Sequence, residues 1–516
     1  MSDSNYYQQQ PQQGMNAPPP QYNQNGNDLS ANEKLNQNYH YDRPPQPLPG
    51  KDTFDETFKV EKPKYNDIPF AILFLATVAG FFVVAGITLR HYATSYSYEG
   101  SSIYNSTNSF SLNTNTVVLF AFVIVVALVL SLGTIAVARI FPRQFITISL
   151  ILNVILGLGT AIAYLVKGYY SAGVVFLVFT AITAFSYWCM RSRIPFSATV
   201  MTIIIDVMKQ HPSTWIITGI GFIVVGAFSA LFSATVVASY MKWGDQTSGS
   251  SNHSKLVGLL VFVFFAGYYI TEVLKNVIHV TVSGIYGTWY YLSKSDGGMP
   301  RFQALGALRR ALTYSFGSIC FGSLIVTLIQ LLRQGVQIVR QNALNNGEAI
   351  QACLLLCVEC FIYVIEWFVR YFNHYAYSYV ALYGKSYLKS ARDTHFIFSY
   401  KGMDALVNDC LIGTALTMYS TFVAYVGALL AYLYLRFTKP GYNTEGTYNA
   451  PVVAFTFLIS MQICNVIGSV IRSGTSTFFL ALAKDPEVYQ ASYPDRFNEV
   501  FRDYPQVLEK IRTRDD

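Results

Sequence analysis

Four polar residues recur at helical spacing in the apolar run near residues 350–371. Glu359, Tyr363, Glu366 and Arg370 fall at positions i, i+4, i+7 and i+11, so they share one face of a helix. Glu366 and Arg370 are four residues apart and can pair directly, and Asn373 continues the face. Two interpretations follow: a structural ion pair with a snorkelling arginine, or the polar lining of a substrate path.

A second apolar run, YYITEVLKNVIHVTVSGIYGTWYYL, carries a similar pattern of charged and aromatic residues. Glu272 lies within it, and Tyr286 and Trp289 follow further along the same predicted helix. Aromatic residues near a helix end often form an interfacial belt. Alternatively, they bind a quaternary ammonium group, which has no hydrogen to donate and exchanges its water for π faces and nearby carboxylates.

The second alternative defines a set of candidate substrate-binding residues that combine aromatic faces with negative charge. These are Glu272, Tyr286, Trp289, Tyr363, Glu366 and Trp367. Arg370 and Asn373 are predicted to support them, with Arg370 holding Glu366 in place. Spacing alone leaves open whether the six converge in one pocket.

Motifs for enzymatic chemistry are largely missing from the sequence. Gly384-Lys385-Ser386 resembles the end of a P-loop, but the glycine required five positions earlier is Tyr379. Neither a zinc-binding HExxH nor a nucleophile elbow in a strand-turn-helix context occurs. Cys357 and Cys360 form a CxxC in the middle of an apolar helix, where small packing residues are the expected interpretation. We therefore expect no enzyme, no metal and no cofactor.

The composition indicates that lipid surrounds most of the chain. Of 516 residues, 52% are hydrophobic and 13% are charged, about half the charged share of typical soluble domains. Ten apolar runs are long enough to cross a bilayer, which requires about 20 residues. They span roughly 68–89, 116–138, 145–165, 170–190, 214–240, 256–276, 311–333, 350–371, 411–435 and 451–473. The predicted fold class is therefore an all-α polytopic membrane protein.

The sixth and eighth runs remain apolar beyond the length that a bilayer requires, to Leu292 and to about Leu388. Each is either one long helix that reaches into the cytosol or a broken helix. The break points would be Gly267, Gly284 or Gly287 in the sixth run, and Gly384 in the eighth.

Basic residues and glycosylation sequons predict the same orientation. Lys and Arg are enriched in the segments that face the cytosol if the N-terminus is cytosolic, and ten crossings return the C-terminus to that side. The sequons at Asn105 and Asn252 then both fall in outer loops. The net charge of +7 is spread over short loops, so it favours this topology over nucleic-acid binding.

Three parts of the chain differ in character. Residues 1–66 are rich in Gln, Asn, Pro and Tyr and are predicted to be a disordered cytosolic tail. No cleavable signal peptide is predicted, because the first apolar run begins near Ile68. Residues 67–484 form the membrane domain, and residues 485–516 are predicted to be an amphipathic cytosolic tail. Residues 195–210 would lie along the inner leaflet or pack beneath the bundle.

The stretch RYFNHYAYSYVALYGKSYLKSARD resembles a conserved block of the choline transporter-like family. The matching positions are Arg370, Tyr371, Asn373, Ala376, Tyr377, Gly384, Lys385, Ser390, Ala391 and Asp393. Two further blocks are similar: GSICFGSLIVTLIQLLR from Gly317, and SGTSTFFLALAKDPEVY from Ser473. The likeness covers residues 68–490, and the Gln-rich tail is most similar to the fungal branch, the pH-nine-sensitive proteins.

The resemblance implies a multi-pass plasma-membrane protein with cytosolic ends that moves choline or a related small organic cation by facilitated transport. An inside-negative potential of 100 mV supplies about 2.3 kcal/mol per charge, so no coupling ion is required. An alternative from another class is a membrane organiser that has this fold but no choline transport. Its N-terminal tail would then recruit cytosolic partners.

Overall fold

The computed structural model describes residues 64–95, 114–243, 249–295, 298–401, 404–438 and 449–502. Within these ranges every regular element is a helix. Most of the predicted disordered tail, the sequon at Asn105 and residues 503–516 lie outside the described residues. Asn252 falls in the first turns of a helix, but its side chain is outside the description as well.

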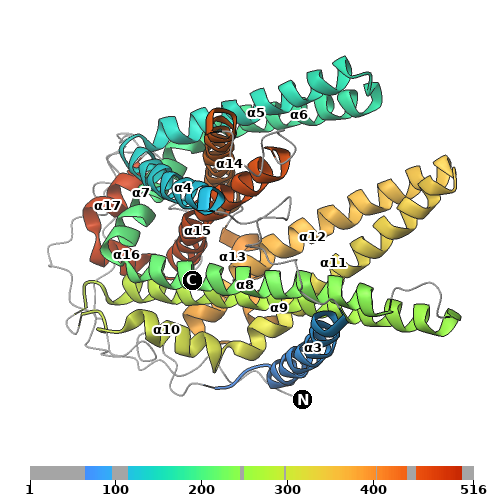
Figure 1. The fold of residues 1–516 in the computed structure, drawn as a ribbon. Helices are drawn as coiled ribbons and strands as arrows, with labels where there is room; N and C mark the ends of the chain where they lie inside the picture. The colour runs from blue at the N-terminus through green and yellow to red at the C-terminus, as the bar shows by residue number, and fades with distance from the viewer. Residues whose placement is uncertain are drawn as a thin grey trace, which may run out of the picture. The chain divides into compact units, whose positions relative to one another are not determined.

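Ten helices are long and apolar enough to cross a membrane, which confirms the predicted all-α polytopic fold (Figure 1). They are α3 (Ile68–Ser95), α4 (Thr114–Ile140), α5 (Pro142–Val166), α6 (Tyr170–Met190), α8 (Ser213–Trp243), α9 (Gly249–Leu292), α11 (Phe316–Asn345), α12 (Ala349–Tyr383), α14 (Asp404–Thr438) and α15 (Asn449–Lys484). The fourth apolar stretch continues from α6 through a 3-10 turn, η1 (Arg191–Arg193), into α7 (Ile194–Gln210). The remaining short helices are α10 (Gln303–Leu312), α13 (Tyr387–Lys401), α16 (Pro486–Ser492) and α17 (Pro494–Arg502).

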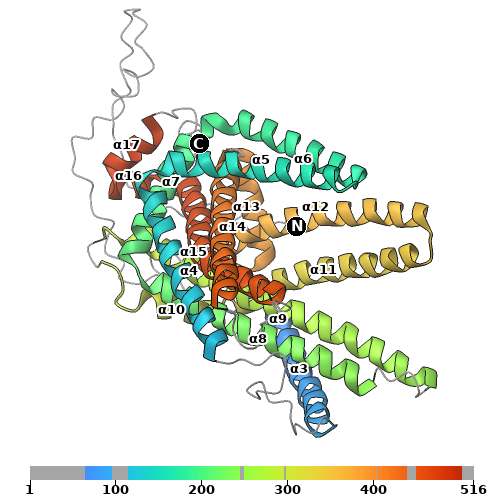
Figure 2. The same cartoon turned by 45° about the horizontal axis from the view of Figure 1, so that its top comes forward.

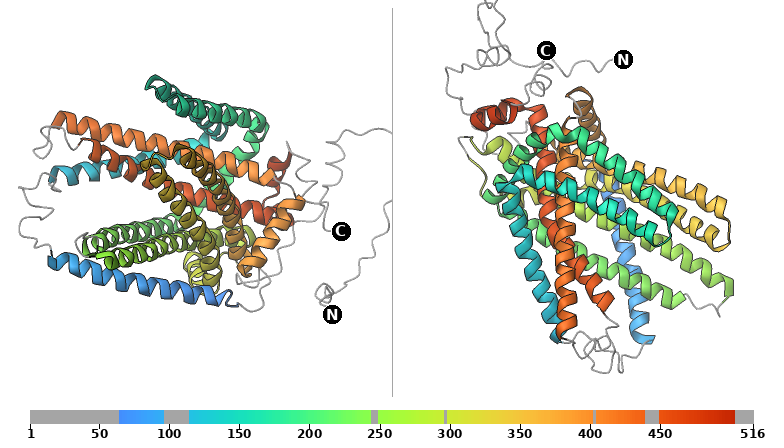
Figure 3. Two further views of the ribbon diagram at one scale, coloured as in Figure 1. Left: turned by 90° about the vertical axis from the view of Figure 1, so that its right-hand side faces the viewer. Right: turned by 90° about the horizontal axis from the view of Figure 1, so that it is seen from above.

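Helices that are consecutive in the chain pair side by side as antiparallel hairpins. The pairs α5–α6, α8–α9, α11–α12 and α14–α15 each pack along their length, as Figures 2 and 3 show. A helix satisfies its own backbone hydrogen bonds, and lipid accepts its apolar side chains. Phe179, Ile182 and Phe185 of α6 are accordingly exposed on the surface of the helices.

The sixth and eighth apolar runs form continuous helices rather than broken ones. Helix α9 has 44 residues, which corresponds to about 66 Å at 1.5 Å per residue. Gly267 lies inside this continuous helix. A Cβ added there would lie 2.3 Å from the Phe232 ring, so glycine is needed for the close approach of α8 rather than for a break. Of the four candidate break points, Gly384 alone ends a helix: it follows α12 with φ 60° and ψ 23°, a left-handed conformation that suits glycine.

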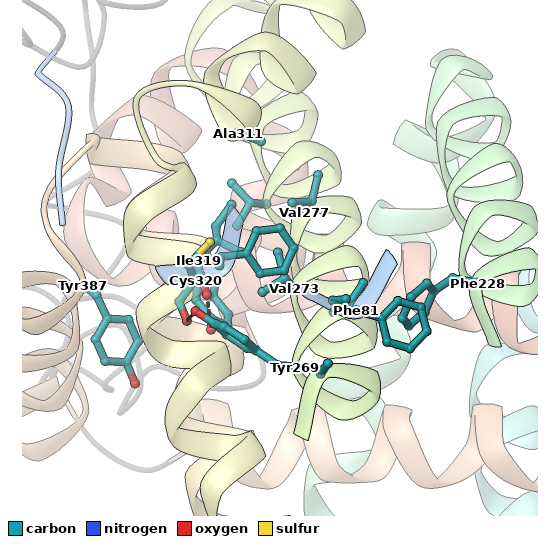
Figure 4. Packing of buried hydrophobic residues seen from close by; sticks show 14 of the residues in the cluster. Phe81, Phe228, Tyr269, Val273, Val277, Ala311, Ile319, Cys320 and Tyr387 are labelled. Atoms are coloured by element: carbon teal, nitrogen blue, oxygen red, sulfur yellow. Dashed lines mark hydrogen bonds between the residues drawn. The ribbon is translucent and has the colours of Figure 1, made fainter. Parts of the chain in front are cut away.

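Helix α9 is the centre of the packing, since it contacts α3, α8, α10, α11, α12 and α15. Its apolar face contributes Tyr269, Val273 and Val277 to a hydrophobic cluster that also includes Phe81 of α3 and Ile319 of α11 (Figure 4). The polar residues discussed below occupy other faces of α9, towards α11, α12 and α15.

One end of this bundle is closed by short segments. We call it the Asp485 end: α9, α12 and α15 terminate there, and α3 and α11 begin there. Asp67, before α3, accepts hydrogen bonds through Oδ2 from the Ser318 hydroxyl (2.6 Å) and the Tyr387 backbone N–H (2.8 Å). Asn66 donates to the Gly384 carbonyl (2.8 Å). These contacts connect the start of α3 to the starts of α11 and α13 and to the end of α12.

Helix α7 covers the segment expected to lie along the inner leaflet or to pack beneath the bundle, and it packs against other helices. Most of its residues are buried, and it contacts α5, α14 and α15. Its Asp206 pairs with Arg139 at the end of α4 (2.5 Å) and with Arg496 of α17 (3.1 Å). The tail beyond Asp485 forms two short helices, and Phe497 and Phe501 are the buried face of the second.

Candidate functional site

Four charged side chains from three helices meet halfway along the bundle. We call Glu272 of α9, Arg333 of α11, and Glu366 and Arg370 of α12 the ionic cluster. Arg370 Nε donates to Glu366 Oε1 (2.9 Å), and its NH1 lies 3.0 Å from both carboxylate oxygens of Glu272. Arg333 NH1 lies 3.2 Å from Glu366 Oε2. Arg370 therefore connects α9 to α12.

The position of the ionic cluster makes pairing obligatory. Glu366 stands at the midpoint of α12, and the side chains of Glu272 and Glu366 are only 8% and 6% exposed. An unpaired carboxylate in such surroundings is strongly unfavourable. Two arginines against two carboxylates leave the cluster without net charge.

The pairing on the Arg333 side is incomplete. The distance between Arg333 NH1 and Glu366 Oε2 suits an ion pair, but Glu366 Oε2 makes no hydrogen bond, nor does the buried Nε of Arg333. Arg333 also lies 5.7 Å from the centroid of the Tyr363 ring. Glu366 is thus held firmly by one arginine and loosely by the other.

A second ionic layer lies two helical turns further from the Asp485 end. Glu359 of α12 pairs with Arg340 of α11 (3.0 Å) and accepts a hydrogen bond from Gln337 (2.5 Å). Arginines seven residues apart on α11 thus face glutamates seven residues apart on α12. This register extends the polar face of α12 along most of its seam with α11.

Towards the Asp485 end, the same seam continues with neutral hydrogen bonds. Asn276 of α9 donates to Ser323 of α11 (2.9 Å), and Asn373 of α12 donates to the Gly322 carbonyl (3.1 Å). The hydroxyl of Tyr387 donates to Asn373 Oδ1. Burial raises the pKa of Tyr387 to about 12, so its phenol remains a donor at any physiological pH.

Two histidines stack next to this layer, between α9, α12 and α15. The rings of His279 and His374 have centroids 3.8 Å apart. His279 Nε2 lies 2.8 Å from the His374 carbonyl, and Nδ1 lies 2.7 Å from Ser473 Oγ. A carbonyl only accepts, so Nε2 carries the proton and Nδ1 of the neutral ring accepts from Ser473.

The Asp485 end holds a tyrosine cluster, which we define as Tyr290, Tyr291, Tyr379 and Tyr383. Tyr291 and Tyr383 donate to Asp485 Oδ2 over 2.5 Å and 3.2 Å, and Tyr290 donates to the backbone carbonyl of Asp485 over 2.9 Å. All four rings are buried. Phenol hydroxyls therefore surround a carboxylate at the point where α15 ends.

The structure brings together only part of the predicted substrate-binding set. Glu272 and Glu366 meet through Arg370, as the helical spacing suggested for Glu366, and Asn373 supports the adjacent layer. Tyr363 and Trp367 lie on the same helix but point outwards, with 57% and 51% of their surface exposed.

Tyr286 and Trp289 lie far from the two carboxylates, at the Asp485 end. Tyr286 donates to the Ile204 carbonyl (3.1 Å), and Trp289 stacks on Tyr493 with ring centroids 5.6 Å apart. Fourteen residues of α9 separate Glu272 from Tyr286, a rise of about 21 Å. The six residues therefore do not surround one point, and their role in binding remains a prediction.

Sequence reasoning missed Arg333, Lys484 and Asp485 as members of polar clusters. Arg333 had one available signal, since it is a basic residue at the end of an apolar run in a helix that continues to Asn345. Lys484 and Asp485 looked like an ordinary charged border of the last membrane helix. Among the described residues, no group of three or more His, Cys, Asp or Glu side chains could hold a metal ion.

Comparison with known proteins gives one consistent result. A family model described as a plasma-membrane choline transporter matches residues 174–487, a range that includes the ionic cluster and the tyrosine cluster. Protein PNS1 of Debaryomyces hansenii is 61% identical over 482 residues, covering 92% of this chain and 93% of that protein. Protein PNS1 of Candida albicans is 57% identical over 474 residues, with coverages of 90% and 91%. Protein PNS1 of Saccharomyces cerevisiae is 52% identical over 473 residues, with coverages of 89% and 88%. The chain belongs to the choline transporter-like family, in the fungal branch that contains these PNS1 proteins.

Proposed function

We propose that the protein carries choline or a related small organic cation across the plasma membrane by facilitated transport. In this proposal both termini are cytosolic, and the Asp485 end faces the cytosol. The observation that supports it most directly is the contact of Arg370 with two carboxylates from two helices at mid-depth. Charged groups at that depth are costly, and in membrane proteins they usually mark a path for substrate or ions.

The ionic cluster suggests how a cation could pass without leaving a bare charge behind. Both carboxylates are neutralised by arginines, so a positive substrate must replace an arginine at Glu272 or Glu366. Glu366 Oε2 is the natural first contact, because its pairing with Arg333 lacks a hydrogen bond. When Arg370 releases Glu272, α9 and α12 lose one of their polar connections and can change their spacing. Alternating access would then accompany the exchange of partners.

The membrane potential provides the driving force in this scheme. One positive charge that crosses 100 mV gains about 2.3 kcal/mol, which corresponds to roughly a fifty-fold concentration ratio. Purified protein in liposomes should therefore take up labelled choline when valinomycin and a potassium gradient make the interior negative. Abolishing the potential should reduce the final accumulation by a similar factor.

Three variants connect that uptake with the ionic cluster. Glu272→Gln and Glu366→Gln should each lower uptake about tenfold or more, because the neutral amide no longer offsets the cation. Glu348→Gln is the matched control: this exposed glutamate precedes α12 and belongs to no described ion pair. If neither choline nor ethanolamine entered above the level of empty liposomes, the proposed function would be wrong.

The Gln-rich segment 1–66 motivates the second candidate, a membrane organiser that binds cytosolic partners. Deleting residues 1–60 separates the two functions. A transporter should keep its uptake rate, because the ionic cluster and its polar seam lie entirely within residues 272–387. An organiser should lose its cellular phenotype while its membrane domain stays intact.

A further inference from the structure

A lysine ammonium at the Asp485 end lies on the face of one tyrosine ring and beside the hydroxyl of a second. Lys484 Nζ is 3.5 Å from the centroid of the Tyr383 ring and 5.1 Å from that of Tyr379. It also donates to the Tyr379 hydroxyl over 3.2 Å. The two rings, one turn apart on α12, have centroids 4.5 Å from each other at an angle of 47°. The face of Tyr383 and the hydroxyl of Tyr379 thus form a corner around the positive charge.

The corner is fixed by its surroundings rather than by the lysine alone. Tyr379 and Tyr383 are 2% and 9% exposed, so their rings are immobilised by packing. The Tyr383 hydroxyl is within hydrogen-bond distance of Asp485 Oδ2 (3.2 Å) and of the Tyr291 hydroxyl (2.9 Å). These contacts hold Tyr383 edge-on to the carboxylate and leave its face to the cation.

Lys484, in contrast, is placed so that it can leave. It is the last residue of α15, it is half-exposed, and its charge sits at the end of four methylene groups. The backbone to which it is attached is a helix end, the part of a helix that rearranges most easily. Movement of the side chain alone would vacate the corner without disturbing the two rings.

The charges around the corner would then favour a different cation. Asp485 lies on one side, and Lys385 lies on the other, 5.4 Å from the Tyr379 centroid and paired with Asp393 at 2.6 Å. With Lys484 in place these four charges cancel. Once its ammonium moves away, one net negative charge remains beside the uncovered face of Tyr383.

We propose that Tyr379 and Tyr383 form a binding site for a quaternary ammonium ion and that Lys484 occupies this site as a tethered competitor. The inference rests on the proposed function, to which it adds the last binding site of the organic cation before the cation leaves the protein at the Asp485 end. A quaternary ammonium cannot donate a hydrogen bond, so ring faces and a nearby carboxylate are the partners that suit it. A lysine that returns to the rings would displace it towards solvent.

Direct binding measurements test the site without requiring transport. Full-length protein in nanodiscs is titrated calorimetrically with choline and with tetramethylammonium. Lys484→Met keeps the length of the side chain but removes its charge, so the affinity for both cations should rise about three- to sixfold, the effect of losing one competing cation–π contact. Lys389→Met, at an exposed lysine of the adjacent helix α13, should leave the affinity unchanged. The neutral isostere 3,3-dimethyl-1-butanol should gain nothing from Lys484→Met.

Two ring variants complete the test. In the Lys484→Met background, Tyr383→Phe keeps the π face and should retain most of the gain, whereas Tyr383→Leu should abolish it. The proposal is overturned if Lys484→Met changes the affinity less than twofold, or if the Tyr383→Leu double variant binds as tightly as Lys484→Met alone. If Lys484→Met tightens binding while liposomes show no uptake, the site stands and the proposed transport function falls.

Discussion

The ionic cluster and the tyrosine cluster both hold charged groups inside the helix bundle, but they surround those groups differently. In the ionic cluster, Glu272 and Glu366 face Arg333 and Arg370, and each charge is balanced by an opposite charge. At the tyrosine cluster, the charge of Lys484 meets the ring face of Tyr383 and the hydroxyl of Tyr379, and that of Asp485 meets phenol hydroxyls. Depth explains the difference, because α12 carries the first cluster at its midpoint and the second at its end.

The comparison shows which charges are free to move. Water cannot replace the arginine beside a carboxylate that is buried at the midpoint of the bundle. The arginine can therefore leave only if another cation takes its place. A lysine at the helix end can exchange a π contact for water at small cost, since an exposed cation–π contact is worth about 0.5–1 kcal/mol. In the proposed transport, the ionic cluster would therefore select the cation, and the Lys484 site would release it.

The largest expected effect comes from breaking the ionic cluster at Arg370. Arg370→Met leaves two buried carboxylates on adjacent helices with only Arg333 to balance them. Removing one partner of a buried ion pair typically costs about 3–5 kcal/mol, so we expect a large loss of folded protein after detergent extraction. Size-exclusion chromatography of samples heated in steps measures this loss as a lower melting temperature.

A triple variant determines whether charge or packing is responsible. Arg370→Met combined with Glu272→Gln and Glu366→Gln contains no unbalanced carboxylate, so most of the lost stability should return. If the triple variant melts as early as Arg370→Met alone, the arginine stem contributes by packing, and the electrostatic account of this cluster is wrong.

The Asp485 end should be more sensitive to the volume of its side chains than to their charge. A Cβ added at Gly474 of α15 would lie 2.6 Å from a ring carbon of Tyr286 and 2.8 Å from Ile204 Cγ2. Gly474→Ala should therefore destabilise the protein by about 1–3 kcal/mol through overpacking. Gly335→Ala is the control, because no atom lies within 4 Å of its added Cβ, and alanine is the better helix former. Equal melting temperatures for the two variants would show that the side chains at the Asp485 end repack without loss of stability.

A smaller effect is expected from neutralising Asp485. Asp485→Asn keeps an oxygen that can accept from Tyr291 and Tyr383 but removes the charge that strengthens both hydrogen bonds. The expected loss of stability is about 1 kcal/mol, the difference between a charged and a neutral acceptor. Glu499→Gln, at an exposed site on α17, should leave the melting temperature unchanged. If Asp485→Asn lowered the melting temperature more than Arg370→Met does, the tyrosine cluster rather than the ionic cluster would contribute more to stability.

The elements were predictable from sequence because hydropathy alone specifies them. All ten membrane helices occur where apolar runs of sufficient length predicted them, and the Glu366–Arg370 pair follows from four-residue spacing on one helix. The sequence alone does not decide whether α9 is continuous, because glycine is compatible both with a break in a helix and with the close approach of another helix. The structure shows a close approach at Gly267, which depends on Phe232 of another helix.

Contacts between helices explain the rest of the difference between expectation and structure. Nothing in the spacing around Glu272 reveals that Arg370, almost a hundred residues later, pairs with it. Trp367 follows Glu366 directly, and neighbouring residues on a helix point about 100° apart, so its ring faces outwards while the carboxylate faces inwards. Convergence of Lys484 with Tyr383 depends on two helix ends that meet only in the folded bundle.

The smallest predicted effect concerns pH and a histidine outside both clusters. His211 lies between α7 and α8, and its Nδ1 is 2.8 Å from Gln303 Nε2 at the start of α10. Burial lowers the pKa of His211 below its usual value of 6.5, since the charged ring would lose hydration. The unfolded chain therefore binds this proton at a higher pH than the folded chain does, and stability falls as the pH drops through 6.5.

Melting curves at pH 7.5 and pH 5.5 measure this contribution. The wild-type protein should lose more of its melting temperature over this interval than His211→Gln does, because glutamine takes up no proton and can still bond to Gln303. His395→Gln, at an exposed histidine of α13, should behave like the wild type. If His211→Gln lost as much as the wild type, protonation of His211 would have no part in the acid sensitivity of the fold.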